Sequence, residues 1–419
     1  MRRGEIAVLS ILACTIAAIV GSALPAQAVT ITPDRDFAGD GRTSLNLPGY
    51  DFATDVVIDG NTSYVIGDAR LRGSKNDYRM AVAKYGPGGH LDRSFGDHGK
   101  KFLLIGRHCR AYSGALAPDG GILVAGWSVT RDAAYVVIAK LRPRGALDRT
   151  FSGDGVTRVA LKDGAEWPLV ESEPDGSIWL TWASVRNYNY DKHVSDLRVM
   201  HFTHNGRVDH SFSGDGVRTF DFRRRDFTYF SDVDSTGRLF VTGFANARPK
   251  ATGVTSVLSV DDNGPAYTRT LAPWAKAGSF PLTVDSDSSD NVVVGMSPYQ
   301  KKGWGAVRLS TDLRLDHSYG HDGVARHDCR CLSTSGALTS QGLVLVGNDN
   351  RDQQRTVVAR FNANGRWDRQ LGNASYNLFP DWEYWVETEV DASGRLVLAG
   401  TVKDQSGDLA IARLEMSPV

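Results

Sequence analysis

The sequence predicts an all-β protein, folded as a seven-bladed β-propeller of four-stranded blades and closed by an N-terminal strand that completes the last blade. Three observations predict this fold. A short aspartate-containing motif recurs along the chain, a turn followed by an apolar run recurs in step with it, and the two chain ends carry complementary parts of one repeat.

The recurring motif reads Leu-Asp-x-Ser-Phe-Gly or a close variant. Clear copies occur at residues 91–96, 147–152, 208–213 and 315–320, weaker copies at 34–41 and 367–372, and a degraded copy at 264–267. The key positions 34, 92, 148, 209, 267, 316 and 368 are separated by 58, 56, 61, 58, 49 and 52 residues. Such regular spacing indicates seven copies of one structural unit.

Each unit also contains a turn followed by an apolar run. The clearest copies lie at residues 118–126, 234–243 and 391–400, and looser ones at 58–67, 174–182, 286–295 and 339–347. A further strand-like run precedes each key position, as at 137–141 and 357–361. About four short strands joined by glycine-bearing turns are therefore expected in each unit, which is the content of a propeller blade.

These repeats resemble those of the delta-60 repeat proteins, a family of bacterial exported propellers. That unit reads roughly as an aspartate-glycine turn, an apolar strand, an apolar strand ending in a basic residue, and then Leu-Asp-x-Ser-Phe-Gly. The resemblance covers nearly all of residues 33–414, and the fifth unit departs most, with Tyr267 where aspartate is expected. It implies an architecture and is almost silent on function.

A basic residue precedes the key aspartate by eight positions in five units. The pairs are Lys84 with Asp92, Lys140 with Asp148, His201 with Asp209, Arg308 with Asp316, and Arg360 with Asp368. In the fifth unit Ser259 and Tyr267 replace both partners. This joint loss predicts a charge-assisted hydrogen bond within each blade, although two independent surface preferences would give the same pattern.

The chain ends predict how the ring closes. Arg413 has no following aspartate, and Asp34 has no preceding strand in its unit. We therefore expect residues 34–47 to supply the outer strand of the last blade, which removes open sheet edges. The aromatic residues of the motif are expected to pack as wedges against a neighbouring strand; they are Phe95, Phe151, Phe212 and Tyr319.

Residues 1–28 have the pattern of a secretory signal peptide cleaved after Ala28, with an uncleaved membrane anchor as the alternative. This predicts a secreted or cell-envelope protein with one propeller domain over residues 29–419. The rest of the chain is nearly neutral, so no overall field attracts nucleic acid. We expect a monomer without a transmembrane span after cleavage.

Three cysteines follow residue 28, namely Cys109, Cys329 and Cys331. A Cys329–Cys331 disulfide and a metal site that adds His327 and Asp328 are both open alternatives. Because no second ligand cluster has metal-site spacing, we predict no metal and no cofactor.

Sequence alone does not identify what the propeller binds. The links between blades and the turns after the second strands vary most, and they carry aromatic residues and arginines, the composition of binding hot spots. We expect a glycan, peptide or protein ligand on this variable face. The candidate residues are Arg107, His108, Arg110, Tyr112, Trp167, Tyr188, Tyr190, Arg224, Trp274, Trp382, Tyr384 and Trp385. Residue by residue, packing beneath their own loops is the competing interpretation.

An enzyme is the second hypothesis, although no common catalytic motif is present and no catalytic residue is predicted. A propeller hydrolase or lyase would draw on carboxylates and histidines from separate blades; the candidates are Glu166, Asp226, Asp381, Glu383, His108 and His327. A structural cell-envelope component is the third hypothesis. A deep axial pocket with facing carboxylates would favour the enzyme, and a shallow aromatic surface would favour binding.

Overall fold

The structure is a computed structural model. It describes residues 29–418 except positions 48, 50, 71–76, 188–193, 222–226, 246–253, 263–265, 272–278, 299–302, 330, 350–354, 380–382 and 403–406. The signal-peptide prediction therefore lies outside the described residues. Among the residues that the structure describes, no helix is long and apolar enough to cross a membrane.

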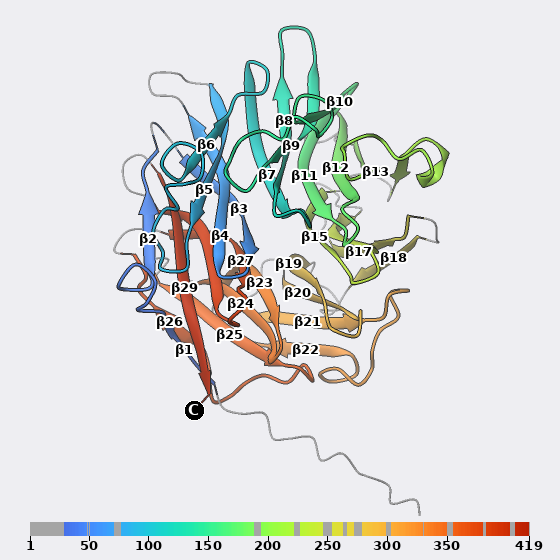
Figure 1. The fold of residues 1–419 in the computed structure, drawn as a ribbon. Coiled ribbons are helices and arrows are strands. Elements are labelled where there is room, and N and C mark those ends of the chain that lie inside the picture. Colours follow the sequence, from blue (N-terminus) through green and yellow to red (C-terminus); the bar gives the residue numbers. More distant parts are fainter. Residues whose placement is uncertain are drawn as a thin grey trace, which may run out of the picture.

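The described residues form seven antiparallel sheets around one axis, as predicted (Figure 1). Blade 1 contains β3 (Asp51–Asp59), β4 (Thr62–Arg70), β5 (Tyr78–Tyr85) and β6 (Lys100–Leu103). Blade 2 contains β7 (His108–Leu116), β8 (Ile122–Val129), β9 (Ala134–Leu141) and β10 (Val156–Ala160). Blade 3 contains β11 (Gly164–Ser172), β12 (Ile178–Asn187), β13 (Val194–Phe202) and β14 (Val217–Phe220), with a 3₁₀ turn at Phe212–Gly214.

The remaining blades repeat this order, with the first strand innermost. Blade 4 contains β15 (Phe227–Val233), β16 (Leu239–Ala245), β17 (Val254–Val260) and β18 (Tyr267–Leu271). Blade 5 contains β19 (Ser279–Ser286), β20 (Val292–Pro298), β21 (Trp304–Leu309) and β22 (Val324–His327). Blade 6 contains β23 (Cys331–Thr339), β24 (Gly342–Asp349), β25 (Thr356–Asn362) and β26 (Ala374–Tyr376).

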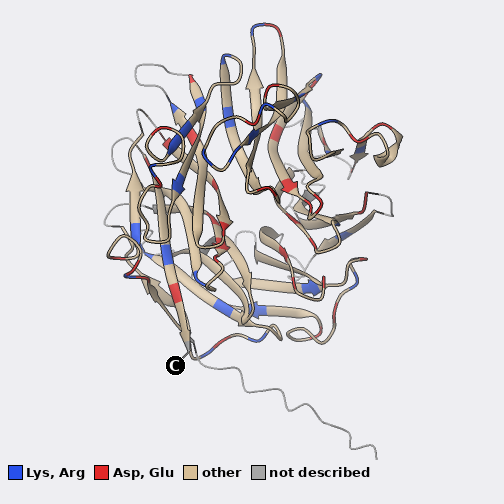
Figure 2. Cartoon of the chain, in the orientation of Figure 1, with Lys and Arg blue, Asp and Glu red and all other residues tan. Residues whose placement is uncertain are grey.

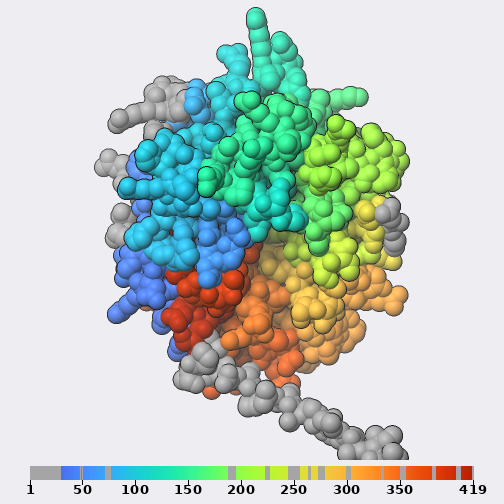
Figure 3. Space-filling view, viewed as in Figure 1, coloured from blue at the N-terminus to red at the C-terminus, as the bar shows by residue number. Residues whose placement is uncertain are grey.

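Blade 7 joins the two ends of the chain. Its inner strands are β27 (Glu383–Val390), β28 (Leu396–Val402) and β29 (Asp408–Pro418). The N-terminal β2 (Arg42–Leu45) pairs with β29 and confirms the predicted closure. One element was not expected, because β1 (Val29–Pro33) pairs with the distal half of the same long strand. The blue N-terminal and red C-terminal segments accordingly lie side by side in Figure 3.

A buried ion pair fixes this closure. Arg413 Nε lies 2.7 Å from Asp34 Oδ2, and the two side chains are only 2% and 6% exposed. The amide of Asp34 also donates to the carbonyl of Arg413, and the guanidinium donates to the Pro87 carbonyl of blade 1. The last blade is thus bonded to the first as well as to the N-terminal strand.

The predicted pairing between strand and following turn is confirmed in four of the five units. The nitrogen–oxygen distances are 3.2 Å for Lys84–Asp92, 3.0 Å for His201–Asp209 and 2.7 Å for Arg308–Asp316, and Arg360 pairs with Asp368. The pair Lys140–Asp148 was wrong. Lys140 instead bonds Asp119, at 2.6 Å, and Arg142 takes Asp148, because each finds a nearer partner in an adjacent turn.

The aromatic wedges join neighbouring blades. Phe95, Phe151, Phe212 and Tyr319 are all almost fully buried. Phe95 packs on Gly145 of the next blade, where a Cβ would meet the ring at 3.1 Å and where φ is +83°. The residue after the aromatic ring then donates its amide to the same turn, as from Gly96 to the Arg144 carbonyl. Glycine is needed at that turn because the aromatic ring occupies the space of a side chain.

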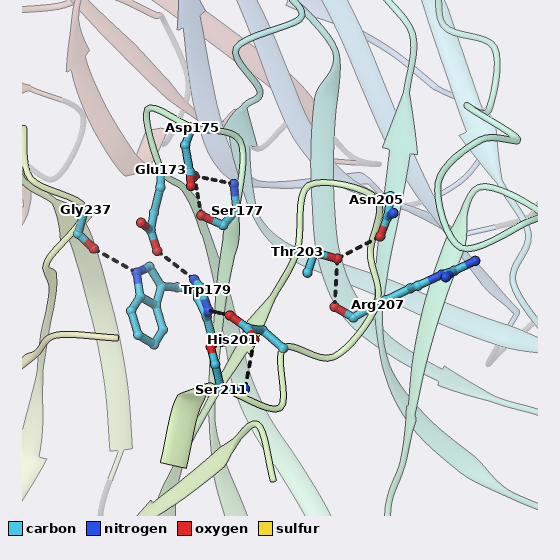
Figure 4. A network of polar contacts seen from close by, with 11 residues as sticks. Glu173, Asp175, Ser177, Trp179, His201, Thr203, Asn205, Arg207, Ser211 and Gly237 are labelled. Atoms are coloured by element: carbon cyan, nitrogen blue, oxygen red, sulfur yellow. Dashed lines mark hydrogen bonds and ion pairs between the residues drawn. The ribbon is translucent and has the colours of Figure 1, made fainter. Parts of the chain in front are cut away.

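In blade 3 a histidine replaces the lysine or arginine of the repeat. His201 Nδ1 lies 3.0 Å from Asp209 and Nε2 lies 2.8 Å from Glu173, while Trp179 packs against the ring (Figure 4). Although burial opposes the charge, the hydrogen bonds to Glu173 and Asp209 raise the pKa of His201. The histidine therefore performs the bridging role that a permanent cation performs in other blades.

Cys329 and Cys331 are joined in a disulfide, and Cys109 is a buried free thiol. Among the described residues, no group of three or more histidine, cysteine or acidic side chains is placed to hold a metal ion.

Candidate functional site: an acidic axial cavity

Every innermost strand contains a β-bulge at the same height. The register shifts lie between Ala53 and Asp55, Ala111 and Ser113, Glu166 and Leu169, Thr228 and Phe230, Pro281 and Thr283, Ser333 and Ser335, and Trp385 and Glu387. A bulge leaves an extra residue unpaired and re-aims its neighbours. Each innermost strand thereby presents two residue positions towards the axis. One position directly follows the bulge, and the other lies two residues further on.

Carboxylates occupy these levels in five of the blades. Asp55 and Glu387 directly follow their bulges, and Glu171, Asp232, Asp285 and Glu389 stand two residues further along. All six line one cavity of about 530 Å³ near the axis. Acidic segments on the inner strands are visible in Figure 2. The lining contains no lysine, arginine or histidine among the described residues, so the cavity is strongly acidic.

Burial raises the pKa of every one of these carboxyl groups. The pKa rises to about 7 for Asp55 and Asp285 and to about 6 for Asp232. For the three glutamates the pKa lies well above its usual value, chiefly through burial and then through repulsion from other carboxylates of the cavity. Because ionised carboxyl groups repel one another, the groups of the cavity titrate as a set, and Asp55 and Asp285, with a pKa of about 7, hold protons near neutral pH.

Several of these carboxylates also tie adjacent blades together. Asp55 accepts a hydrogen bond from the Gly114 amide at 2.7 Å, and Glu171 accepts from the Ser231 hydroxyl at 2.7 Å. Asp232 accepts from both the amide and the hydroxyl of Ser286. These bonds give the acids a structural role at the blade seams. A carboxylate has about four acceptor positions, so the same groups retain capacity for a ligand.

Aromatic side chains stand at the bulges of blades 2 to 4. Tyr112 accepts a hydrogen bond from Trp127 Nε1 and meets Trp167 edge-on at 5.7 Å between ring centres. Trp167 stacks on Tyr229 at 5.6 Å and is 42% exposed. Tyr112 and Tyr229 line the cavity together with the acids. The cavity wall therefore carries two tyrosine rings beside the carboxyl groups.

Tyr384 of blade 7 belongs to the same region. It is 45% exposed, and its charge contributes, after burial and Glu166, to raising the pKa of Tyr229 to about 12. Three of the candidates from sequence are thus associated with the aromatic part of this site, namely Tyr112, Trp167 and Tyr384. Tyr229 is not among the residues predicted from the sequence.

Other sequence candidates lie along the edge of blade 2. Arg110 bonds the buried Asp68 at 2.6 Å and covers the ring of Tyr78, so it joins blades 1 and 2. Arg107 is exposed, and His108 Nδ1 lies 3.9 Å from Asp77. Trp385 is fully buried, and its indole donates to Thr356, in accordance with the packing interpretation. Tyr188, Tyr190, Arg224, Trp274 and Trp382 lie outside the described residues.

The candidate residues of the enzyme hypothesis are only partly described. Asp226 and Asp381 lie outside the described residues, as does the side chain of Glu383. His327 stacks on Trp367 in blade 6, away from the cavity lining. The six cavity acids were missed. The available signal was acidic residues at period two in otherwise apolar first strands, as in residues 387–389, where Glu-Thr-Glu places two acids on one side.

Comparison with known proteins supports the architecture. Residues 117–151 match the model of a domain of unknown function, DUF5122, described as a beta-propeller. This segment runs from the end of β7 through β8 and β9 to the motif of one repeat. No curated protein matches the chain.

Solved structures with the same fold are distant in sequence. The polysaccharide lyase Uly1 is 10% identical, with a TM-score of 0.52 over 90% of this chain and 98% of its own. A PL25 ulvan lyase bound to GlcA(1-4)Rha3S is 11% identical, with a TM-score of 0.50 over 88% and 94%. A protein of unknown function from Dyadobacter fermentans DSM 18053 is 12% identical, with a TM-score of 0.47 over 90% and 100%. At these identities the similarity to the two lyases establishes the propeller fold alone.

Proposed function

We propose that this propeller is an exported binding protein that holds an organic cation in its axial cavity. The observation that carries the proposal is the convergence of six carboxyl groups with a raised pKa and two tyrosines on one cavity whose lining includes no basic side chain among the described residues. A seventh acid of the lining, Asp391, is paired with Arg395 at 2.7 Å. Ammonium and guanidinium groups are attracted by carboxylates and by the π faces of aromatic rings. An elongated polycation that reaches several carboxylates at once fits this arrangement better than a single ion.

The proposal is tested by titrating the mature chain with a hexalysine peptide, using the peptide acetylated at every lysine as the neutral control. We expect the charged peptide to bind and the acetylated peptide not to bind. Replacing Glu387→Gln together with Glu389→Gln should weaken binding at least tenfold, which is about 1.4 kcal/mol. The matched control Asp97→Asn alters an exposed carboxylate on the outer part of blade 1 and should leave the affinity unchanged. Failure of hexalysine to bind, or equal binding by both variants, would contradict the proposal.

A glycoside hydrolase is the second candidate, because an axial pocket with carboxyl groups from several blades is the feature expected of an enzyme. It ranks second because burial raises the pKa of all six acids, so none is distinguished as the ionised partner. Glycoside cleavage uses one carboxyl group that keeps its proton and a second that is ionised. The raised pKa of Asp55 and Asp285 gives the cavity proton-bearing acids near neutrality. Release of reducing ends from a panel of polysaccharides, abolished by Asp55→Asn, would establish this activity. A panel without turnover would contradict it.

A further inference from the structure

A second surface stands apart from the axial cavity, at the outer seam between blades 5 and 6. It is a groove of about 770 Å³, lined by Arg326 of β22 and by Arg366, Trp367 and Arg369 of the turn after β25, together with His321. None of these residues lines the axial cavity. The groove is basic, whereas the cavity is acidic.

Trp367 gives the groove a fixed aromatic surface. Its ring stacks on His327, with 3.4 Å between ring centres and 6° between planes, and it meets the edge of Phe361. At the same motif position four other units carry an aliphatic residue, namely Leu91, Leu147, Val208 and Leu315. An aliphatic side chain therefore suffices for the packing of a blade, and the indole adds an aromatic surface that the fold does not require.

The charges around Trp367 are arranged for an anion. Arg326, Arg366 and Arg369 are all exposed. The carboxylate that lines the groove, Asp322, is already paired with His317 at 2.6 Å. In blade 2 the residue at the register position of Arg326 is Arg158, and the residue of the next blade at the position of Trp367 is Val208. Three arginines beside a tryptophan distinguish this seam from that one.

We propose that the groove between blades 5 and 6 binds an anionic polysaccharide. The apolar face of a sugar ring packs on Trp367, which offers a large, rigid contact area. The guanidinium groups of the flanking arginines pair with carboxylate or sulfate substituents, since their planar donors match such oxyanions. The size of the groove lies within the range of ordinary ligand sites and exceeds what a single small anion fills.

The probes are a heparin oligosaccharide, which is sulfated, a polygalacturonate oligosaccharide, which carries carboxylates only, and a dextran oligosaccharide, which is neutral. We expect at least one anionic oligosaccharide to bind and dextran not to bind. Trp367→Leu installs the residue of the other units, so the fold should be retained, and binding should weaken at least fivefold. The double variant Arg366→Gln, Arg369→Gln should bind at least tenfold more weakly, and its binding should depend less on salt concentration.

The matched control is the double variant Arg93→Gln, Arg149→Gln. Arg93 and Arg149 occupy the position of Arg369 in other repeat units. This control should keep full affinity. If it loses as much affinity as the groove variant, the attraction is spread over the whole rim and the proposal is wrong. The proposal is equally wrong if neither anionic oligosaccharide binds, whether or not phosphatidylglycerol vesicles bind. The Glu387→Gln and Glu389→Gln variant should bind the oligosaccharide normally, which separates this test from that of the axial cavity.

Discussion

Asp285 allows the acidic cavity to be tested through protein stability. Its pKa rises from 3.8 to about 7, mainly because the group is buried and next because Asp232 lies near it. A carboxyl group with a raised pKa in the folded state binds its proton more tightly there than in the unfolded state. The contribution of Asp285 to the free energy of unfolding is therefore fully present below about pH 4, and it is lost as pH rises towards and through 7.

The size of this effect follows from the shift. About three pKa units at about 1.36 kcal/mol each give about 4 kcal/mol of stability lost between pH 4 and pH 8. With an unfolding entropy of about 2.1 cal/mol/K per residue over roughly 390 residues, this corresponds to a fall of about 5 °C in Tm. Asp285→Asn keeps an acceptor for Thr283 and cannot ionise, so its Tm should fall less by about that amount.

Thermal unfolding followed by circular dichroism at pH 4.5, 6, 7 and 8 measures this difference. The wild-type Tm should decline over the series, and the Asp285→Asn variant should decline less. Asp97→Asn, at an exposed site, should follow the wild-type curve. Parallel curves for wild type and Asp285→Asn would refute the conclusion that cavity carboxyl groups retain protons near neutrality.

Three further predictions concern other parts of the ring. Arg413→Ala removes the nearer of the two arginines that contact the buried Asp34, with Arg395 remaining at 3.4 Å, and should cost about 3 kcal/mol in urea denaturation. Lys84→Ala, in a more exposed pair, should cost about 1 kcal/mol or less, and equal costs would show that closure does not depend on the Arg413–Asp34 pair. Because the pKa of His201 is raised in the folded protein, its stabilising contribution is fully present below the usual histidine pKa and is lost as pH rises through the higher folded value. The urea midpoints of His201→Gln and wild type should therefore differ more at pH 6 than at pH 9, and a constant difference would contradict a charged bridge. Trp167→Ala should weaken hexalysine binding several-fold, because the indole is 42% exposed and stacks on Tyr229 of the cavity lining; an unchanged affinity would remove the aromatic wall from the site.

The fold could be predicted in detail because a repeat reports its own period. The spacing of the key aspartates gives the blade count, and the unmatched Arg413 and Asp34 give the closure. β1 was missed because nothing in the repeat requires a second N-terminal strand. The Lys140–Asp148 pair failed because a repeat cannot specify which of two nearby acids a flexible lysine reaches, and Asp119 lies in an adjacent turn.

The candidate site could be predicted only in part. Tyr112, Trp167 and Tyr384 were predicted because they are aromatic and lie outside the repeated motif, and the structure places them in the aromatic part of the site. The six acids were overlooked because the period-two pattern, as at residues 387–389, shows that acids share one side of a strand but not whether that side faces the axis or a neighbouring blade. The direction in which these side chains point depends on the β-bulge of each inner strand. A bulge changes which residues face the axis and leaves no distinct pattern in the sequence.

The most direct test of the cation site is the number of protons released on binding. Hexalysine is titrated into the mature chain at pH 7 in phosphate and in Tris, two buffers whose ionisation enthalpies differ. A cation bound among carboxyl groups with a pKa near 7 lowers that pKa, so about one proton per peptide should be released. The Glu387→Gln and Glu389→Gln variant should release fewer. Binding with the same heat in both buffers would contradict the placement of the cation in the acidic cavity.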